Sequence, residues 1–203
     1  MKGKKPGSTL GLGLILALTI NLAMWLPAAR AAAPMEDIKT LINEVQTILQ
    51  THCQKSERVN LIEQVSMLHI DFREMSKRCL GSTWATLGEA QKQEFVHLFS
   101  DLMKASYAKH LDDFVKAKVN YLGETANADT AEVRISVIRP NDRIPVNFHL
   151  IKEAQGWRVY DLVIEGVSMV SNYRSQFARA INAISYQGLL ARLKAHLKAE
   201  AHG

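Results

Sequence analysis

Gly166, Val167 and Ser168 follow an apolar stretch and precede a helical pattern, which is where hydrolases present the serine of a GxSxG motif. Two observations argue against that chemistry. Val170 stands where the second glycine is needed, and its β-branched side chain opposes the tight turn that exposes the nucleophile. The only acidic residue after Ser168 is Glu200, so the hydrolase order of serine, acid and histidine is not met. We therefore interpret Ser168 as a helix N-cap.

Two histidines stand near carboxylates. His69 precedes Asp71 by two residues, and His97 lies four residues before Asp101, which makes them neighbours on a helix surface. Each pair has the residue types of an acid/base couple, but no oxyanion site or second carboxylate is near. We interpret both as solvated helix faces and predict no catalytic residue.

Cysteine and histidine spacing predicts no metal site. The two cysteines and seven histidines form neither CxxC nor HExxH. In an oxidising compartment Cys53 and Cys79 could close a disulfide, and the alternative is two separate buried thiols. The sequence leaves both possibilities open because it does not supply the Cα separation.

Apolar residues recur at helical spacing in the first part of the chain. Residues 34–50 form one such segment, with Pro34 in the first turn. Residues 59–72 form a second, and a short helix follows that ends at Gly81, a plausible C-cap. Residues 86–89 have capping-box spacing and open an amphipathic helix that extends to Tyr107.

From residue 115 the hydrophobic period changes to two, which predicts strands. The turn sequences between them are short, which favours antiparallel hairpins. Asp161 and Glu165 are interpreted as edge or turn residues that orient the helix after the sheet. The order of helices, four-stranded meander and two more helices predicts an α+β fold with about six helices. The four strands are expected at 118–122, 133–137, 146–150 and 157–164, and the last helices at 168–184 and 187–197.

The first 31 residues have the three-part pattern of a secretory signal peptide. Three lysines precede an uncharged stretch over 6–29, and the small-residue site Ala29-Arg30-Ala31 follows. An uncleaved membrane anchor is the competing interpretation because the stretch approaches the length that spans a bilayer. We expect cleavage after Ala31 and an exported domain over residues 32–203.

The net charge of +5 does not indicate a nucleic-acid partner. Four of the 25 basic residues precede Glu36, the first of 20 acidic residues, so the chain beyond residue 31 has a formal charge of +1. A near-neutral chain lacks the basic footprint that phosphate backbones require.

Bulky apolar residues on several helices must face one small sheet, and they form either a filled core or an apolar cavity.

The chain contains the long motif WRVYDLVIEGVS over 157–168, followed by NYRSxF over 172–177. These motifs resemble the MlaC family of periplasmic phospholipid-transport, or toluene-tolerance, proteins. Shorter matches are Ile70-Asp71-Phe72 with Met75, Leu80-Gly81 with Trp84, and Gln91 with Phe95, Phe99 and Tyr107. The resemblance covers residues from about 35 to 197, and Cys53 and Cys79 are outside its pattern.

The resemblance implies a twisted antiparallel sheet wrapped by helices, related to the NTF2-like cone, that encloses an apolar pocket. It implies a non-enzymatic periplasmic shuttle whose cargo is a phospholipid and which needs no other cofactor. The implied partners are an outer-membrane lipoprotein–porin complex and the MCE-domain protein of an inner-membrane ABC transporter, a system that maintains outer-membrane asymmetry. A hopanoid is an alternative cargo. The residues expected to contact acyl chains are Phe99, Leu102, Tyr107, Val163, Val170, Tyr173, Phe177 and Ile181.

Overall fold

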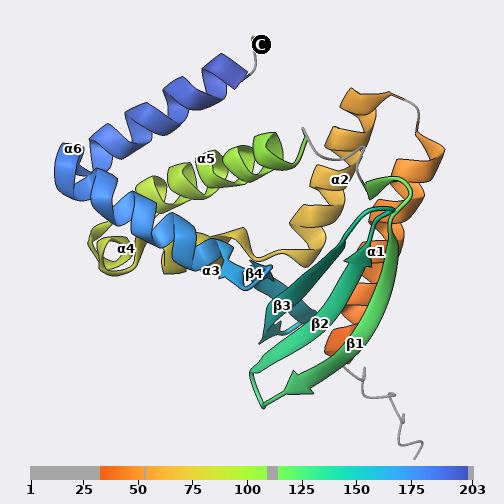
Figure 1. The fold of residues 1–203 in the computed structure, drawn as a ribbon. Coiled ribbons are helices and arrows are strands. Elements are labelled where there is room, and N and C mark those ends of the chain that lie inside the picture. Colours follow the sequence, from red (N-terminus) through yellow and green to blue (C-terminus); the bar gives the residue numbers. More distant parts are fainter. Residues whose placement is uncertain (1–32, 53, 109–113, 201–203) are drawn as a thin grey trace, which may run out of the picture. The chain divides into compact units, whose positions relative to one another are not determined.

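The computed structural model describes residues 33–52, 54–108 and 114–200 (Figure 1). The predicted signal peptide over 1–31, Cys53 and the side chain of Tyr107 lie outside the described residues. No helix within the described ranges is both long enough and apolar enough to cross a bilayer.

The described residues form six helices, which is the number that the sequence predicts, although one of the six was not predicted and another combines two predicted helices. Their boundaries are α1 Pro34–Thr51, α2 Lys55–His69, α3 Phe72–Leu80, α4 Ser82–Thr86, α5 Glu89–Ala108 and α6 Met169–Glu200. Helix α2 ends before the expected residue 72. Ile70 leaves the helix to make a parallel bridge with Val159, and the Asp71 N–H donates to the Val159 carbonyl over 2.8 Å. The Asp71 carboxylate then caps α3 by accepting the N–H of Glu74.

Helix α4 was not predicted, and it changes how α5 begins. Gly81 ends α3 with φ of 56° and also precedes α4, so the predicted C-cap is confirmed. The predicted capping box over residues 86–89 is wrong. The Thr86 hydroxyl donates to the Thr83 carbonyl inside α4, and the side chain of Gln91 accepts the Gly88 N–H over 3.0 Å instead.

The sheet is antiparallel with strand order β1-β2-β3-β4-β5, which confirms the α+β class. The strands are β1 Lys118–Ala126, β2 Thr130–Ile138, β3 Arg143–Glu153, β4 Gly156–Ile164 and β5 Val167–Ser168. The predicted number of four strands is corrected by β5, whose two residues are too short to produce a periodic signal. Glu165 and Gly166 both have positive φ, 51° and 80°, as a tight hairpin turn requires.

A β-bulge in β4 decides which of its side chains face the core. Val159 pairs with Leu150 and Asp161 pairs with His149, so Tyr160 is the extra residue. One extra residue reverses the alternation beyond it. Leu162 and Ile164 therefore pack against the core, opposite Phe148 and Val146. Asp161 and Val163 lie on the opposite, polar face, in register with His149 and Asn147.

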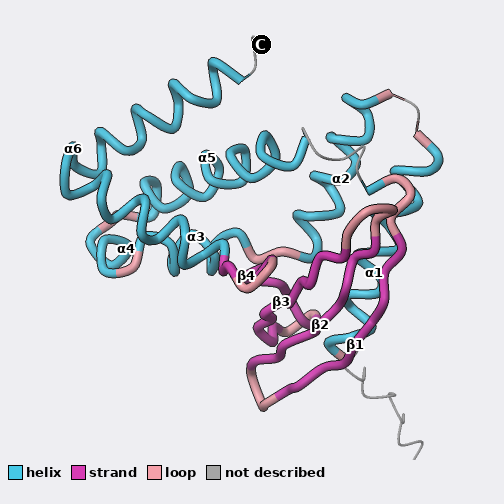
Figure 2. The backbone as a smooth tube through the Cα atoms, in the orientation of Figure 1, coloured by secondary structure: helices cyan, strands magenta, loops and turns pink. Residues whose placement is uncertain are grey.

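Helix α6 combines the two helices predicted at the C-terminus. Ser185, with φ of 68° and ψ of 170°, breaks the helical geometry between them. Both halves contact α5, the first through the rings of Phe177 and Phe95 and the second through Lys194, whose ammonium donates to Glu94. Figure 2 shows α6 turning back along α5 on one side of the domain, while α1 lies along the sheet.

Candidate functional site

An apolar cavity lies between α2, the start of α3 and α5. Its volume is about 40 Å³, which holds only a few water molecules at the roughly 10–15 Å³ that each needs. Its walls come from segments far apart in the sequence. The lining residues are Val59, Ile62, Glu63, Ser66, Met67, Ile70, Phe72, Ser100, Met103, Lys104 and Ala108.

Helix α2 covers this cavity but is itself weakly buried. None of its residues is buried, although it carries six bulky apolar side chains. Met67, which lines the cavity, is 50% exposed, and the adjacent Leu68 is 71% exposed. A helix whose apolar residues are only half covered is held weakly by packing, because burial of apolar surface is the main stabilising contribution.

Polar contacts attach α2 at a few points. At its C-terminal end the Arg158 guanidinium donates to the carbonyls of Met67 and Ile70 over 2.8 and 2.7 Å. His69 Nε2 lies 3.1 Å from a carboxylate oxygen of Glu44 on α1. Across the cavity, Lys104 of α5 forms an ion pair with Glu63 of α2. The last contact joins the helix to the opposite wall.

A cluster of aromatic rings fills the contact between α5 and α6. The Tyr173 ring meets the edge of Phe99 with centroids 5.3 Å apart and stacks on Phe177 at 5.5 Å. Phe95 contacts Phe99, Phe177 and Tyr186. Burial, with a smaller effect of the nearby Glu94, raises the pKa of Tyr186 to about 12. Its hydroxyl donates to the Gln91 carbonyl over 3.1 Å, which satisfies the one polar group of the cluster.

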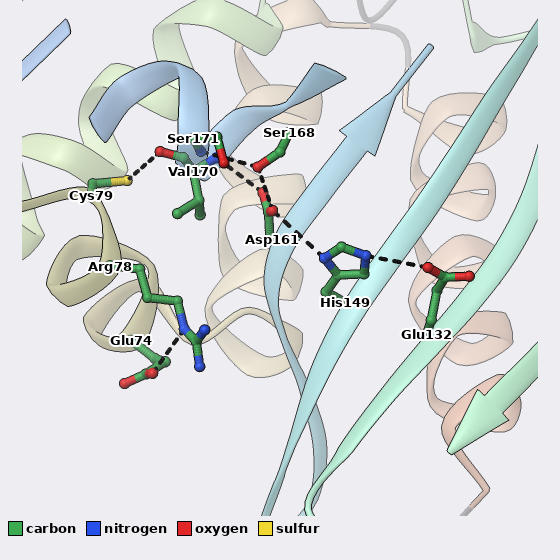
Figure 3. A network of polar contacts seen from close by, with 9 residues as sticks. All are labelled: Glu74, Arg78, Cys79, Glu132, His149, Asp161, Ser168, Val170 and Ser171. Atoms are coloured by element: carbon green, nitrogen blue, oxygen red, sulfur yellow. Dashed lines mark hydrogen bonds and ion pairs between the residues drawn. The ribbon is translucent and has the colours of Figure 1, made fainter. Parts of the chain in front are cut away.

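Asp161 joins the sheet to the start of α6 (Figure 3). Asp161 is 5% exposed, and its carboxylate accepts the Ser168 hydroxyl over 2.6 Å and the Val170 N–H over 3.0 Å. The Ser168 oxygen in turn accepts the Ser171 N–H over 3.0 Å, which confirms Ser168 as the N-cap. Asp161 thus orients the following helix, as predicted from the sequence.

The same contacts argue against a nucleophilic serine. A catalytic triad places histidine between serine and carboxylate, so that the imidazole can take the hydroxyl proton. Here the carboxylate of Asp161 lies between them, with His149 Nδ1 at 3.7 Å from the oxygen that accepts the Ser168 hydroxyl. His149 also faces Glu132, whose pKa is held below its usual range by the Arg134 guanidinium. The arrangement suits a helix cap.

The histidine–carboxylate pairs of the sequence are separated or exposed. His69 contacts Glu44, whereas Asp71 caps α3. His97 is 78% exposed, 3.6 Å from Asp101. Within the part of the chain that the structure describes, no three histidine, cysteine or acidic side chains gather as metal ligands would.

Cys79 is a free thiol that is 1% exposed in the core, and its sulfur lies 3.8 Å from the Val170 carbonyl. Burial is the main cause that raises its pKa to about 12, with Asp161 adding to it and Arg174 opposing it. We expect iodoacetamide at pH 8 to modify Cys79 only after unfolding, because the thiol stays protonated and covered. Mass spectrometry of the peptide that contains Cys79 measures this separately from Cys53. Modification in native buffer as fast as in urea would contradict it.

A match between the chain and a family model decides the family. The model of the MlaC protein matches residues 39–195, from α1 to the second half of α6. The chain belongs to the MlaC family.

A relative and a solved structure show the extent of the likeness. The intermembrane phospholipid transport system binding protein MlaC of Haemophilus influenzae is 23% identical over 133 residues, which is 62% of this chain and 62% of that protein. A solved structure of the phospholipid-binding protein from Ralstonia solanacearum, in complex with a phospholipid, has a TM-score of 0.78 at 23% identity. The structural match covers 84% of this chain and 99% of the Ralstonia chain, so the two proteins share the fold.

The eight residues predicted to contact lipid separate into groups in this MlaC fold. Phe99, Tyr173 and Phe177 come together in the aromatic cluster. Val163, although expected to contact acyl chains, lies on the polar sheet face because of the bulge at Tyr160. The role of all eight residues in lipid contact stays a prediction. Leu102 and Val170 are buried, Ile181 packs at the edge of the core, and the Tyr107 side chain lies outside the described residues.

Sequence reasoning missed the residues that line the cavity. Val59, Ile62 and Ser66 recur at helical spacing on α2, and Ser100 with Met103 does so on α5. The periodicity shows that each helix has an apolar face. It does not show that the two faces meet, because the helices are separated by α3 and α4 in the chain.

Proposed function

We propose that this protein is a soluble, exported carrier that binds a phospholipid by its acyl chains. The observation that carries the proposal is the apolar cavity beneath α2, a helix with no buried residue. A cavity of about 40 Å³ must widen to accept an acyl chain, and α2 is the wall held most weakly by packing. Membership of the MlaC family supports the same function.

The relatives support the nature of the cargo. The Ralstonia protein, which shares the fold, was solved in complex with a phospholipid, and the Haemophilus relative belongs to an intermembrane phospholipid transport system. We propose that this chain moves phospholipid through the periplasm between an outer-membrane lipoprotein–porin complex and the MCE-domain protein of an inner-membrane ABC transporter. Such exchange maintains outer-membrane asymmetry. A hopanoid is the second candidate cargo, since an apolar wall does not specify the lipid class.

The physical chemistry of the cavity suits a carrier rather than an enzyme. Burial from water stabilises an acyl chain by about 0.8 kcal/mol per methylene. A chain that passes from a bilayer to a protein cavity exchanges one apolar surrounding for another, so most of that free energy cancels. Lipid can then be retained in water and still be transferred in either direction. Shape and apolarity are the main requirements; the cavity of this protein is lined mainly by apolar side chains, and it must widen to fit an acyl chain.

Native mass spectrometry tests the proposal. Protein purified from the periplasm is expected to carry a mass increment equal to one lipid, and extraction followed by lipid mass spectrometry identifies phospholipid or hopanoid. Folded protein that repeatedly carries no lipid, and takes none from vesicles, would overturn the proposal. Hydrolysis of added phospholipid that is lost on Ser168→Ala would instead favour an enzyme.

Filling the cavity tests its position. Ser100→Trp places an indole at the cavity wall and is expected to reduce lipid occupancy at least about fivefold, because two bulky groups cannot share one packed space. Ser175→Trp is the matched control, since Ser175 is exposed on α6 and its hydroxyl, like that of Ser100, bonds its own helix. Lipid per folded protein, measured after circular dichroism confirms the fold, is the readout. Equal occupancy in both variants would place the acyl chains elsewhere.

A further inference from the structure

Glu63 and Lys104 carry the only charges among the described residues that line the cavity. Glu63 belongs to α2 and Lys104 to α5, and their ion pair bridges the two walls. Each side chain is about one-third exposed, 35% for Glu63 and 33% for Lys104, so the pair lies at the mouth rather than in the apolar interior. A charged pair at the mouth of an apolar cavity is the place where the polar end of an amphiphile would lie.

We propose that Lys104 binds the phosphate of the cargo and that Glu63 is its competitor. This inference rests on the proposed function and adds the group that recognises the headgroup. In the lipid-free protein the Lys104 ammonium pairs with Glu63 and ties α2 to α5. In the loaded protein the phosphate replaces the Glu63 carboxylate on Lys104, and α2 is released from the opposite wall as the acyl chains enter beneath it.

Three observations support an exchange of partners. A phosphate diester and a carboxylate present the same kind of oxygen acceptor to an ammonium, so one can replace the other. The pair is partly exposed, so a headgroup reaches it without entering the core. The contacts that hold the C-terminal end of α2, from Arg158 to the carbonyls of Met67 and Ile70, are independent of Lys104 and can remain as the pivot.

The two residues are therefore expected to affect lipid preference in opposite directions. The assay mixes delipidated protein with vesicles that contain equal amounts of dioleoyl phosphatidylglycerol and dioleoylglycerol, which have the same chains with and without a phosphate. Extracted lipid is quantified by mass spectrometry. Lys104→Gln is expected to lower the phospholipid-to-diacylglycerol ratio about tenfold, the order of a lost charge-assisted hydrogen bond. Lys104→Arg should retain most of the preference.

Glu63→Gln is expected to raise the same ratio severalfold, because the ammonium loses its competing carboxylate. A role limited to stabilising the fold predicts that Lys104→Gln and Glu63→Gln change the ratio equally or not at all, and either result overturns the inference. The matched control is the ion pair of Lys194 and Glu94, which joins α6 to α5 outside the cavity. Neither Lys194→Gln nor Glu94→Gln should alter the ratio.

The assay separates this inference from the proposed function. If the wild-type protein and the variants all extract the two lipids equally, the role of Lys104 is overturned, but lipid carriage is not. Wild-type protein that extracts neither lipid overturns both. A further measurement adds inorganic phosphate at millimolar concentration as a competitor. If it lowers phospholipid loading of the wild-type protein but not of Lys104→Gln, the site recognises phosphate itself.

Discussion

Phe177→Ala is expected to lower the free energy of unfolding by about 3–5 kcal/mol, the cost of removing a buried phenyl ring. Phe177 is 4% exposed, and its ring contacts Phe95, Phe99 and Tyr173. These contacts join α5 to the first half of α6, so the cavity left by alanine cannot be closed by one side chain. Urea unfolding of delipidated protein, followed by circular dichroism, measures the change.

The same variant tests the prediction that Phe177 contacts acyl chains. If the ring belongs to the packed core, the loss of stability should be equal with and without lipid. Ile184→Ala on the same helix is the control, because Ile184 is 45% exposed and should cost no more than about 1 kcal/mol. A small cost in delipidated protein and a large cost in loaded protein would show that the ring packs on lipid and not on protein.

Asp161→Ala is expected to lower the free energy of unfolding by about 2–4 kcal/mol, because it leaves the buried Val170 N–H and the Ser168 hydroxyl without their acceptor. Ser168→Ala removes the N-cap alone and should cost about 1 kcal/mol. Denaturant unfolding of both variants measures the difference. Asp101→Ala is the control, since Asp101 lies on the partly exposed face of α5 beside His97.

Equal costs for Asp161→Ala and Ser168→Ala would contradict the role given to Asp161. In that case the carboxylate would act only through the serine. The larger expected effect follows from position, since Asp161 lies on β4 and holds the first turn of α6, whereas Ser168 caps only its own helix. Within the stretch WRVYDLVIEGVS, Asp161 and Ser168 thus position α6 against α5, and a structural role accounts for both residues.

The proposed carrier mechanism depends on unequal stability within one domain. The aromatic cluster between α5 and α6 is closely packed, whereas α2 has no buried residue. Elements held by little apolar burial open at a lower free energy than the core around them. In the proposed mechanism a lipid enters beneath α2 while α5, which forms the other wall, stays fixed by its contacts with α6.

Local structure was largely predictable from the sequence. The segment that begins at Pro34, the cap at Gly81 and the N-cap at Ser168 depend on residues close together in the chain, and the structure confirms each. The four longer strands were also predicted, though each was expected to be shorter than it is, because alternation is strongest at strand centres. The motif over 157–168 indicated the MlaC family because it is long and specific.

Only the tertiary structure decided which faces meet. The bulge at Tyr160 places Val163 on the polar side of the sheet, and one extra residue in a strand leaves no signal in composition. The cavity combines Ile62 of α2 with Met103 of α5, and the ion pair of Glu63 and Lys104 spans 41 positions of the chain. Periodicity shows that a helix has an apolar face, but the packing of the whole domain determines which other element that face contacts.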